Sequence, residues 1–293
     1  MLELKFPRLI TAPNSRSVLK LCNRAIRRRK TDIMFDLSTV EFITPFGITV
    51  ISGTTTQCLR AGKRVFYRLP RKNEVHQYLS SIGFLDFFEM NAIGAQQRRT
   101  SIALRQLMGL DPIYIDDLVQ LIDFNMNLSR GVRDSIRLSV QELLTNAFDH
   151  SRSPIGCFVC AQFTPKRQLI RLSVTDFGIG IFRALTTVKA YSNVKNSHAA
   201  ITLALEEGVS SRRGKTAGYG LWHIRRFARV NKGTMTVISG DGKVNFYHKS
   251  IEPRPMPSEF KGTAIELKIN ADKEGFYFLT GERESLFGDI GSG

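Results

Sequence analysis

Apolar and polar positions along residues 1–109 follow two periods in turn. Runs rich in branched and aromatic residues predict β-strands at 2–10, 32–43 and 63–70. The segments that follow these runs place apolar residues three and four positions apart, which predicts helices at 15–30, 46–62 and 73–88. Strands that alternate with helices predict an α/β layer architecture for this part of the chain.

Residues 113–270 show the same patterns in another order. Two helices are predicted first, and they are followed by the two strands of a hairpin, at 115–128, 129–151, 156–165 and 168–178. A further helix then precedes three strands, at 220–230, 234–240, 242–248 and 262–269. This order predicts a layer of helices on a mixed sheet, which is an α/β sandwich.

A linker is predicted between these two parts. Residues 95–112 begin polar, become amphipathic and end in Asp111-Pro112. A length of 293 residues is enough for two ordinary domains, so we expect domains at 1–109 and 110–293, the second with a short C-terminal tail.

The net charge of +16 is concentrated in the first part. Residues 1–109 contain 18 Lys or Arg against 7 Asp or Glu, whereas residues 110–293 contain 24 against 19. Such an excess fits attraction to nucleic acid, anionic lipid or an acidic protein. The densest basic run, residues 27–30, also fits a solvated helix end, because Lys and Arg are favourable at a helix C-terminus.

The compartment is expected to be the cytoplasm. No stretch approaches the roughly 20 apolar residues that cross a bilayer, and the first ten residues lack a signal-peptide pattern. Four cysteines fit a reducing environment. Cys157 and Cys160 lie in a predicted strand that directs them to opposite faces, so we expect both to be buried; metal or redox chemistry is the alternative.

The predicted helix 129–151 carries the first candidate for chemistry. Glu142 and Asn146 are one helical turn apart, so their side chains project from the same face. An amide oxygen can bind Mg²⁺, and a carboxylate can orient or deprotonate a nucleophile. Asp149 follows three residues later, where it can hold metal-bound water or fix a neighbouring amide. Ordinary surface residues are the alternative for this pattern taken alone.

Two glycine-rich segments supply further candidates. Asp176 ends a predicted strand, where its carboxylate can accept a hydrogen bond from an adenine amino group. Gly178 and Gly180 then allow the backbone to turn and to approach the base closely. The same D-x-G-x-G pattern also occurs in calcium loops and ordinary turns.

The second glycine-rich segment, residues 214–221, leads into the predicted helix 220–230. Backbone amides at a helix N-terminus bind anions such as a triphosphate, and Gly218, Gly220 and Leu221 supply them here. Lys215 can reach the γ-phosphate; a solvated basic loop is the alternative.

Together these segments resemble the N-box and glycine boxes of the GHKL ATPases, the group that includes gyrase, sensor histidine kinases and MutL. The resemblance implies a Bergerat α/β sandwich that binds ATP and Mg²⁺. It implies catalysis by Glu142, metal binding by Asn146, and adenine contacts by Asp176 and Thr263. Aspartate at position 149 is typical of the gyrase and MutL branch, whereas histidine kinases usually have lysine there.

The resemblance also implies a lid over the nucleotide, at residues 182–217. Ser192, Asn193, Asn196 and Ser197 are expected to make parts of this segment flexible, and ATP is expected to order it. The family pattern G-x-G-x-G-L is incomplete here, since Ala217 stands before the two remaining glycines.

Residues 1–109 resemble the STAS domain of anti-anti-sigma factors. The matching residues are Phe35-Asp36-Leu37-Ser38 and Val40-Glu41-Phe42-Ile43, which lead into Thr44-Pro45-Phe46-Gly47. In the family this last stretch reads D-S-S-G, and its second serine accepts phosphate. Phe46 occupies that position and cannot be phosphorylated, so we expect a docking or scaffold domain; Thr44 is a weak substitute as acceptor.

Three functions remain open from the sequence. The first is an ATP-dependent regulatory switch with slow ATPase activity, the second is a serine/threonine kinase of the anti-sigma type, and the third is a nucleotide-sensing adaptor. Each implies a protein partner, either STAS-like, sigma-factor-like or an effector. Nucleic acid is a further partner that the basic first domain suits, and the resemblance to GHKL proteins implies a homodimer as one arrangement.

Overall fold

The structure of the chain is a computed structural model that describes residues 1–29, 31–88, 100–126, 130–149, 151–210, 220–230, 233–247 and 250–270. Its first part confirms the predicted alternation of strands and helices. The elements are β1 (Leu2–Lys5), β2 (Leu9–Ile10), α1 (Ser15–Arg27), β3 (Ile33–Asp36), β4 (Phe42–Ile43), α2 (Pro45–Arg60), β5 (Val65–Arg68), α3 (Asn73–Ser81) and α4 (Phe84–Phe87). Strands β1, β3 and β5 form a parallel sheet, and β2 pairs with β4, also in parallel.

The second part is built around one larger sheet. Its elements are β6 (Ser101–Leu107), α5 (Pro112–Met126), α6 (Arg130–Asp149), β7 (Cys157–Thr164), η1 (Pro165–Arg167), β8 (Leu169–Asp176), α7 (Gly180–Thr186), η2 (Lys189–Tyr191), α8 (Ser197–Ala204), α9 (Gly220–Val230), β9 (Thr234–Phe246) and β10 (Ile251–Asn270). The strand order is β6-β7-β8-β10-β9. None of the described helices combines the length and apolar character needed to cross a membrane.

Three details of this sheet differ from the prediction. All four strand pairings are antiparallel, so the expected mixed sheet is wrong for the second part. The expected linker is wrong for residues 101–107, because β6 pairs with β7 and belongs to this sheet rather than to the first part. The strands predicted at 234–240 and 242–248 are one strand, β9, which continues through Gly240 with a positive φ of 60°.

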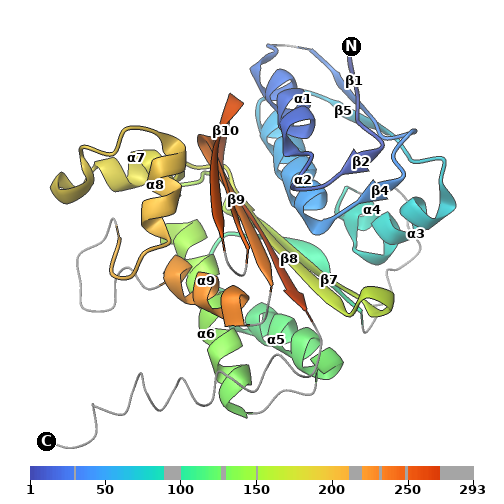
Figure 1. Cartoon of the computed structure of the whole chain (residues 1–293). Coiled ribbons are helices and arrows are strands. Elements are labelled where there is room, and N and C mark those ends of the chain that lie inside the picture. Colours follow the sequence, from blue (N-terminus) through green and yellow to red (C-terminus); the bar gives the residue numbers. More distant parts are fainter. Residues whose placement is uncertain are drawn as a thin grey trace, which may run out of the picture.

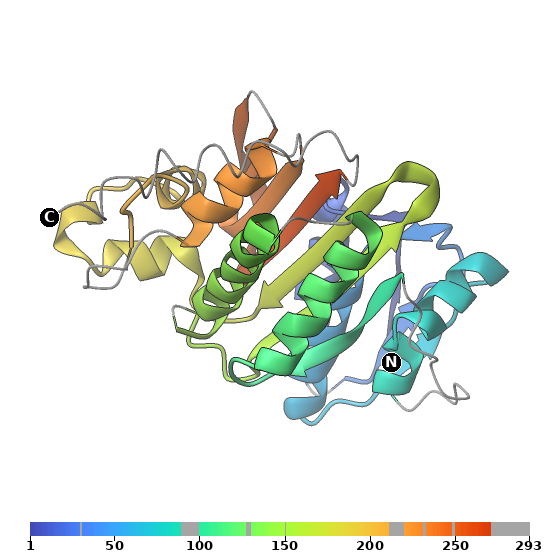
Figure 2. The ribbon, with the colours of Figure 1, turned by 90° about the horizontal axis from the view of Figure 1, so that it is seen from below.

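The sheet lies between two layers. Helices α5, α6 and α9 cover one face, and the first part of the chain covers the other (Figure 1; Figure 2 shows these three helices in front of the sheet). Alternate residues of each strand therefore enter different cores. Cys157 lies in the core on the helical side and Cys160 in the core on the other side, which confirms that both are buried and on opposite faces; both thiols are free.

Helix α2 makes the most extensive contact between the first part of the chain and the sheet. Its Thr49 hydroxyl is 3.0 Å from the Ser173 hydroxyl and 2.8 Å from that of Thr175, both on β8. At the start of the helix, the Thr44 hydroxyl donates to Glu266 of β10 at 2.8 Å. The four hydroxyl groups are buried and hydrogen-bonded across this contact. The second carboxylate oxygen of Glu266 has no hydrogen-bond partner in the described structure and lies 3.6 Å from the Lys268 ammonium group. Buried apolar residues of both parts belong to one core, so the two parts pack directly against each other.

Candidate functional site

Asp176 is the centre of the candidate site. It ends β8 and is only 3% exposed, opposite Thr263 on β10. The Gly178 amide donates to its carboxylate at 2.9 Å, and Thr263 donates through both its amide and its hydroxyl. Burial is the largest effect and raises the pKa of Asp176 to about 7, although these three donors act in the opposite direction.

The glycines around Asp176 are required by close backbone packing. A Cβ at Gly178 would lie 1.8 Å from the Ser151 carbonyl oxygen, and one at Gly262 would lie 2.1 Å from that of Asp176. Gly180 begins α7 with a φ of 78°, a conformation that favours glycine. The sequence analysis expected Gly178 and Gly180 to allow close approach of a base. In the structure, the space in which a Cβ would lie at each of them is next to another part of the protein.

Ser151 ties helix α6 to this loop. Its hydroxyl donates to the Ala147 carbonyl in the last turn of α6 at 2.5 Å, and its own carbonyl accepts from the Ile179 amide at 2.7 Å. The end of α6 that carries Asn146 therefore meets the loop that follows Asp176. The sequence prediction missed this serine, because a single serine at the end of a helix carries no distinctive signal.

The three predicted residues of α6 differ in their exposure. Glu142 and Asn146 are half-buried, whereas Asp149 is exposed. The Asn146 side-chain nitrogen is buried and has no hydrogen-bond partner in the described structure. Since a buried amide without a partner is costly, this side chain suits contact with a ligand that offers a hydrogen-bond acceptor.

These residues can hold a Mg²⁺ ion only in a site where the protein supplies few of the ligands. Among the described residues, no group of three or more His, Cys, Asp or Glu is arranged to hold a metal. Mg²⁺ usually takes one or two protein oxygens and completes its shell with water and phosphate. The Asn146 amide oxygen fits this sparse type of site, and an all-protein cage does not.

A second serine that the prediction missed connects three elements. Ser239 on β9 accepts from the Ile181 amide at 2.9 Å and donates to the Gly262 carbonyl at 2.9 Å. Its hydroxyl also lies 3.2 Å from that of Thr263, which bonds Asp176. The carboxylate is thus one end of a buried hydroxyl network that reaches the start of α7.

The N-terminus of α9 completes the described part of the site. Gly220 is the first residue of this helix, as predicted. Leu221 packs against the core on the helical side of the sheet and against a small core formed by Leu185 of α7 with Ala200 and Ala204 of α8. Ile181 packs against the same two cores. Lys215 and Gly218, the other residues predicted to bind phosphate, lie outside the described residues.

The first part of the predicted lid contains two helices. Residues 180–186 and 197–204 form α7 and α8, and α8 packs against β9. Asn196 caps α8 by accepting from the Ala199 amide at 2.9 Å, and Ser197 is buried. These two residues therefore belong to the start of a helix rather than to a loop, because short polar side chains favour helix starts as well as loops.

Removing this cap is expected to loosen α8. We expect Asn196→Ala to cost about 1 kcal/mol of helix stability, since one amide of the first turn loses its acceptor. Hydrogen exchange of the α8 amides measures the effect. Asn193→Ala is the matched control, because Asn193 is exposed and makes no hydrogen bond within the described structure; equal exchange in both variants would contradict the capping role.

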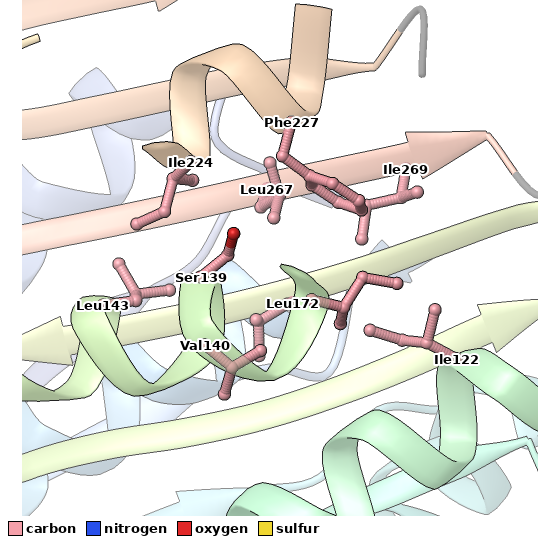
Figure 3. A pocket seen from close by; sticks show the side chains of 10 residues that line it. Ile122, Ser139, Val140, Leu143, Leu172, Ile224, Phe227, Leu267 and Ile269 are labelled. Carbon is pink, nitrogen blue, oxygen red and sulfur yellow. The ribbon is translucent and has the colours of Figure 1, made fainter. Parts of the chain in front are cut away.

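A small gap lies on the helical side of the sheet, away from Asp176. Its volume is about 10 Å³, which is room for about one water. Figure 3 shows its lining from α5, α6, α9, β8 and β10: Ile122, Ile136, Ser139, Val140, Leu143, Leu172, Ile224, Phe227, Leu267 and Ile269. The gap is a packing defect of the core and is far too small for a nucleotide.

Comparison with known proteins adds no assignment. No protein-family model matches the chain, and no curated protein matches it. A function must therefore be argued from the motifs and from the geometry of this site.

Proposed function

We propose that this chain is an ATP-dependent regulatory switch with a GHKL-type nucleotide site and a STAS-like first part. The observation that carries the proposal is the buried carboxylate of Asp176, held by Gly178 and Thr263 at the end of a central strand. A buried carboxylate between two fixed donors keeps acceptor capacity for one more donor, such as the amino group of adenine. The helix that meets this loop carries Glu142 and Asn146 one turn apart, a spacing that permits one side chain to bind the metal and the other to orient the nucleophile.

Each residue has a separate task in this proposal. The bound MgATP supplies the phosphoryl group and the metal charge. Asp176 and Thr263 bind the base, and the Asn146 amide oxygen holds the metal. Glu142 orients the water and accepts its proton.

The phosphate contacts come from the second glycine-rich segment. Backbone amides at Gly218, Gly220 and Leu221 and the ammonium group of Lys215 bind the triphosphate. Asp149 is exposed and suits contact with metal-bound water rather than with the base.

The docking of the first part favours a switch over phosphorylation within the chain. Thr44 is 3% exposed and its hydroxyl is engaged by Glu266, while Phe46, at the phosphoacceptor position of STAS domains, is fully buried. No hydroxyl at this position is presented to a kinase site. A serine/threonine kinase that acts on a separate STAS-like protein is the second candidate, and a nucleotide-sensing adaptor is the third.

The proposal is tested by titrating MgATP onto the full chain by calorimetry and measuring phosphate release on the same samples. Asp176→Asn is expected to weaken binding at least about tenfold, since the charged acceptor is replaced by a neutral amide oxygen, which accepts a weaker hydrogen bond. Glu142→Ala is expected to bind ATP and to release phosphate roughly 100-fold more slowly.

The matched control is Glu74→Gln, which removes one negative charge at an exposed position on α3. It is expected to behave as wild type in both assays. Wild-type protein that binds ATP without releasing phosphate would favour the kinase or the adaptor, and transfer to a separate STAS-like protein distinguishes these two. Failure of folded wild-type protein to bind MgATP would overturn the proposal.

A further inference from the structure

Helix α1 has two faces of different character. Five residues of one face are buried against the rest of the protein: Ser15, Val18, Leu19, Cys22 and Ala25. The opposite face presents a row of exposed cations three or four residues apart: Arg16, Lys20, Arg24 and Arg27. We call these four residues the α1 stripe; exposed Arg28 and Arg29 extend it beyond the end of the helix.

The charge of the α1 stripe is not compensated locally. The sequence contains no Asp or Glu between Lys5 and Thr31. Ion pairs with acidic partners involve other basic residues of the first part, such as Arg8, Arg64 and Arg68, whereas no stripe residue makes one within the described structure. Charges left uncompensated in a row produce a local positive field that attracts an anionic partner.

An acidic residue on the neighbouring strand β10, Glu259, does not change this. The Asn23 side chain, on the flank of α1, donates to the backbone carbonyl of Glu259 on β10 at 2.6 Å. The Glu259 carboxylate itself lies 3.8 Å from Arg183. This acid is therefore directed to another cation, and the α1 stripe keeps its charge.

We propose that the α1 stripe binds the phosphate backbone of double-stranded nucleic acid. Residues four apart rise about 6 Å along a helix, so the stripe from Arg16 to Arg27 spans roughly 17 Å. That length covers about five phosphates of one strand at roughly 3.4 Å of duplex axis each. Three of the four cations are arginines, whose planar guanidinium groups match phosphate oxygens in pairs.

The same helix is poorly suited to other anionic surfaces. A membrane-binding amphipathic helix inserts its apolar face, but the apolar face of α1 is already buried in the protein core. Single-stranded nucleic acid is usually bound by aromatic side chains that stack on bases, and α1 contains no aromatic residue. The exposed face of α1 offers charged groups alone, which suits contact with the phosphate backbone of a duplex without recognition of its base sequence.

The test uses the full-length chain without nucleotide, so that its outcome does not depend on the ATP site. Fluorescence anisotropy with a labelled 20-base-pair DNA duplex is measured over a range of salt concentrations. The stripe variant neutralises four cations: Arg16→Gln, Lys20→Gln, Arg24→Gln and Arg27→Gln. Glutamine has nearly the helix propensity of Lys and Arg, so α1 is expected to form, which circular dichroism checks.

The matched control removes the same charge from exposed positions on other elements: Arg71→Gln, Lys72→Gln, Lys166→Gln and Arg167→Gln. We expect the stripe variant to bind duplex at least about 30-fold more weakly, with a salt slope reduced by roughly 3, since each lost phosphate contact removes about 0.9. The control is expected to stay within about threefold of wild type.

Three results would overturn the inference. One is equal weakening of both variants, which would mean that net charge alone drives binding. Another is wild-type affinity in the stripe variant. The third is wild-type binding to vesicles of phosphatidylserine and phosphatidylcholine with no binding to duplex.

Discussion

Replacing Gly53 with alanine is expected to destabilise the protein by about 3 kcal/mol or more, although alanine is the better helix former. A Cβ at Gly53 of α2 would lie 1.9 Å from Cε2 of Phe177, the residue after Asp176. Phe177 is 1% exposed and is held by Phe158 and Phe260, with ring centroids 6.1 and 5.4 Å away. Urea unfolding is expected to give a lower midpoint with an unchanged slope.

The direction of the change in stability distinguishes the two possibilities. Without the contact, Gly53→Ala in the middle of a helix would stabilise the protein by up to about 1 kcal/mol. Gly109→Ala is the control, since nothing lies within 4 Å of its added Cβ, and it is expected to be nearly neutral. In a Phe177→Ala background the penalty at Gly53 should largely disappear, as a double-mutant cycle measures. A Gly53→Ala protein as stable as wild type would mean that α2 does not rest on this loop.

Through the contact of Gly53 with Phe177, the first part of the chain packs directly against the loop that follows Asp176. A chain of aromatic contacts, with centroids 4.9–6.1 Å apart, leads from the parallel sheet to the loop through Tyr67, Phe84, Phe88, Phe87, Phe158 and Phe177. Close-packed rings transmit displacement because they cannot compress. If ATP binding moves the loop, as the proposed switch requires, α2 is the first element outside the site to respond.

The local elements of the fold could be predicted from the sequence, but their assembly could not. The helical period of α1 and α6 and the alternation in β7 and β8 are properties of a few adjacent residues. The placement of β6 beside β7 depends on pairing between residues at least 50 positions apart, and the polar start of the segment at residue 95 concealed it. The hydrogen bond between Thr49 and Ser173 in a buried interface likewise joins residues 124 positions apart, which no local pattern predicts.

The candidate site shows the same division. Asp176 and Gly178 could be identified because their pattern, common in ordinary turns when taken alone, follows a predicted strand about thirty residues after Glu142 and Asn146. Ser151 and Ser239 were missed because a single serine carries no periodic signal, and only the fold brings them to the loop. The burial of Asp176, which determines its protonation, is likewise a property of the assembled chain.

Stability is expected to fall as pH rises from about 4 to 7 because of Asp176. Its folded pKa, about 7, lies above the ordinary value of 3.8. Between these values the unfolded chain releases a proton that the folded protein retains, so the free energy of unfolding decreases with pH. The stabilisation is complete below about pH 4 and is lost by about pH 7, with a slope of up to about 1.4 kcal/mol per pH unit and a total on the order of 4 kcal/mol.

Chemical denaturation at a series of pH values measures this slope, and Asp176→Asn is expected to reduce it because asparagine does not titrate. Glu74→Gln, which removes an exposed carboxylate, should retain the wild-type slope. An unchanged slope in Asp176→Asn would show that the folded protein accepts the ionised carboxylate without cost. An adenine amino group that donates to Asp176 favours its ionised form, so saturating ADP is expected to lower the pH at which the decline ends. The same titration therefore links the protonation of this buried carboxylate to the proposed nucleotide site.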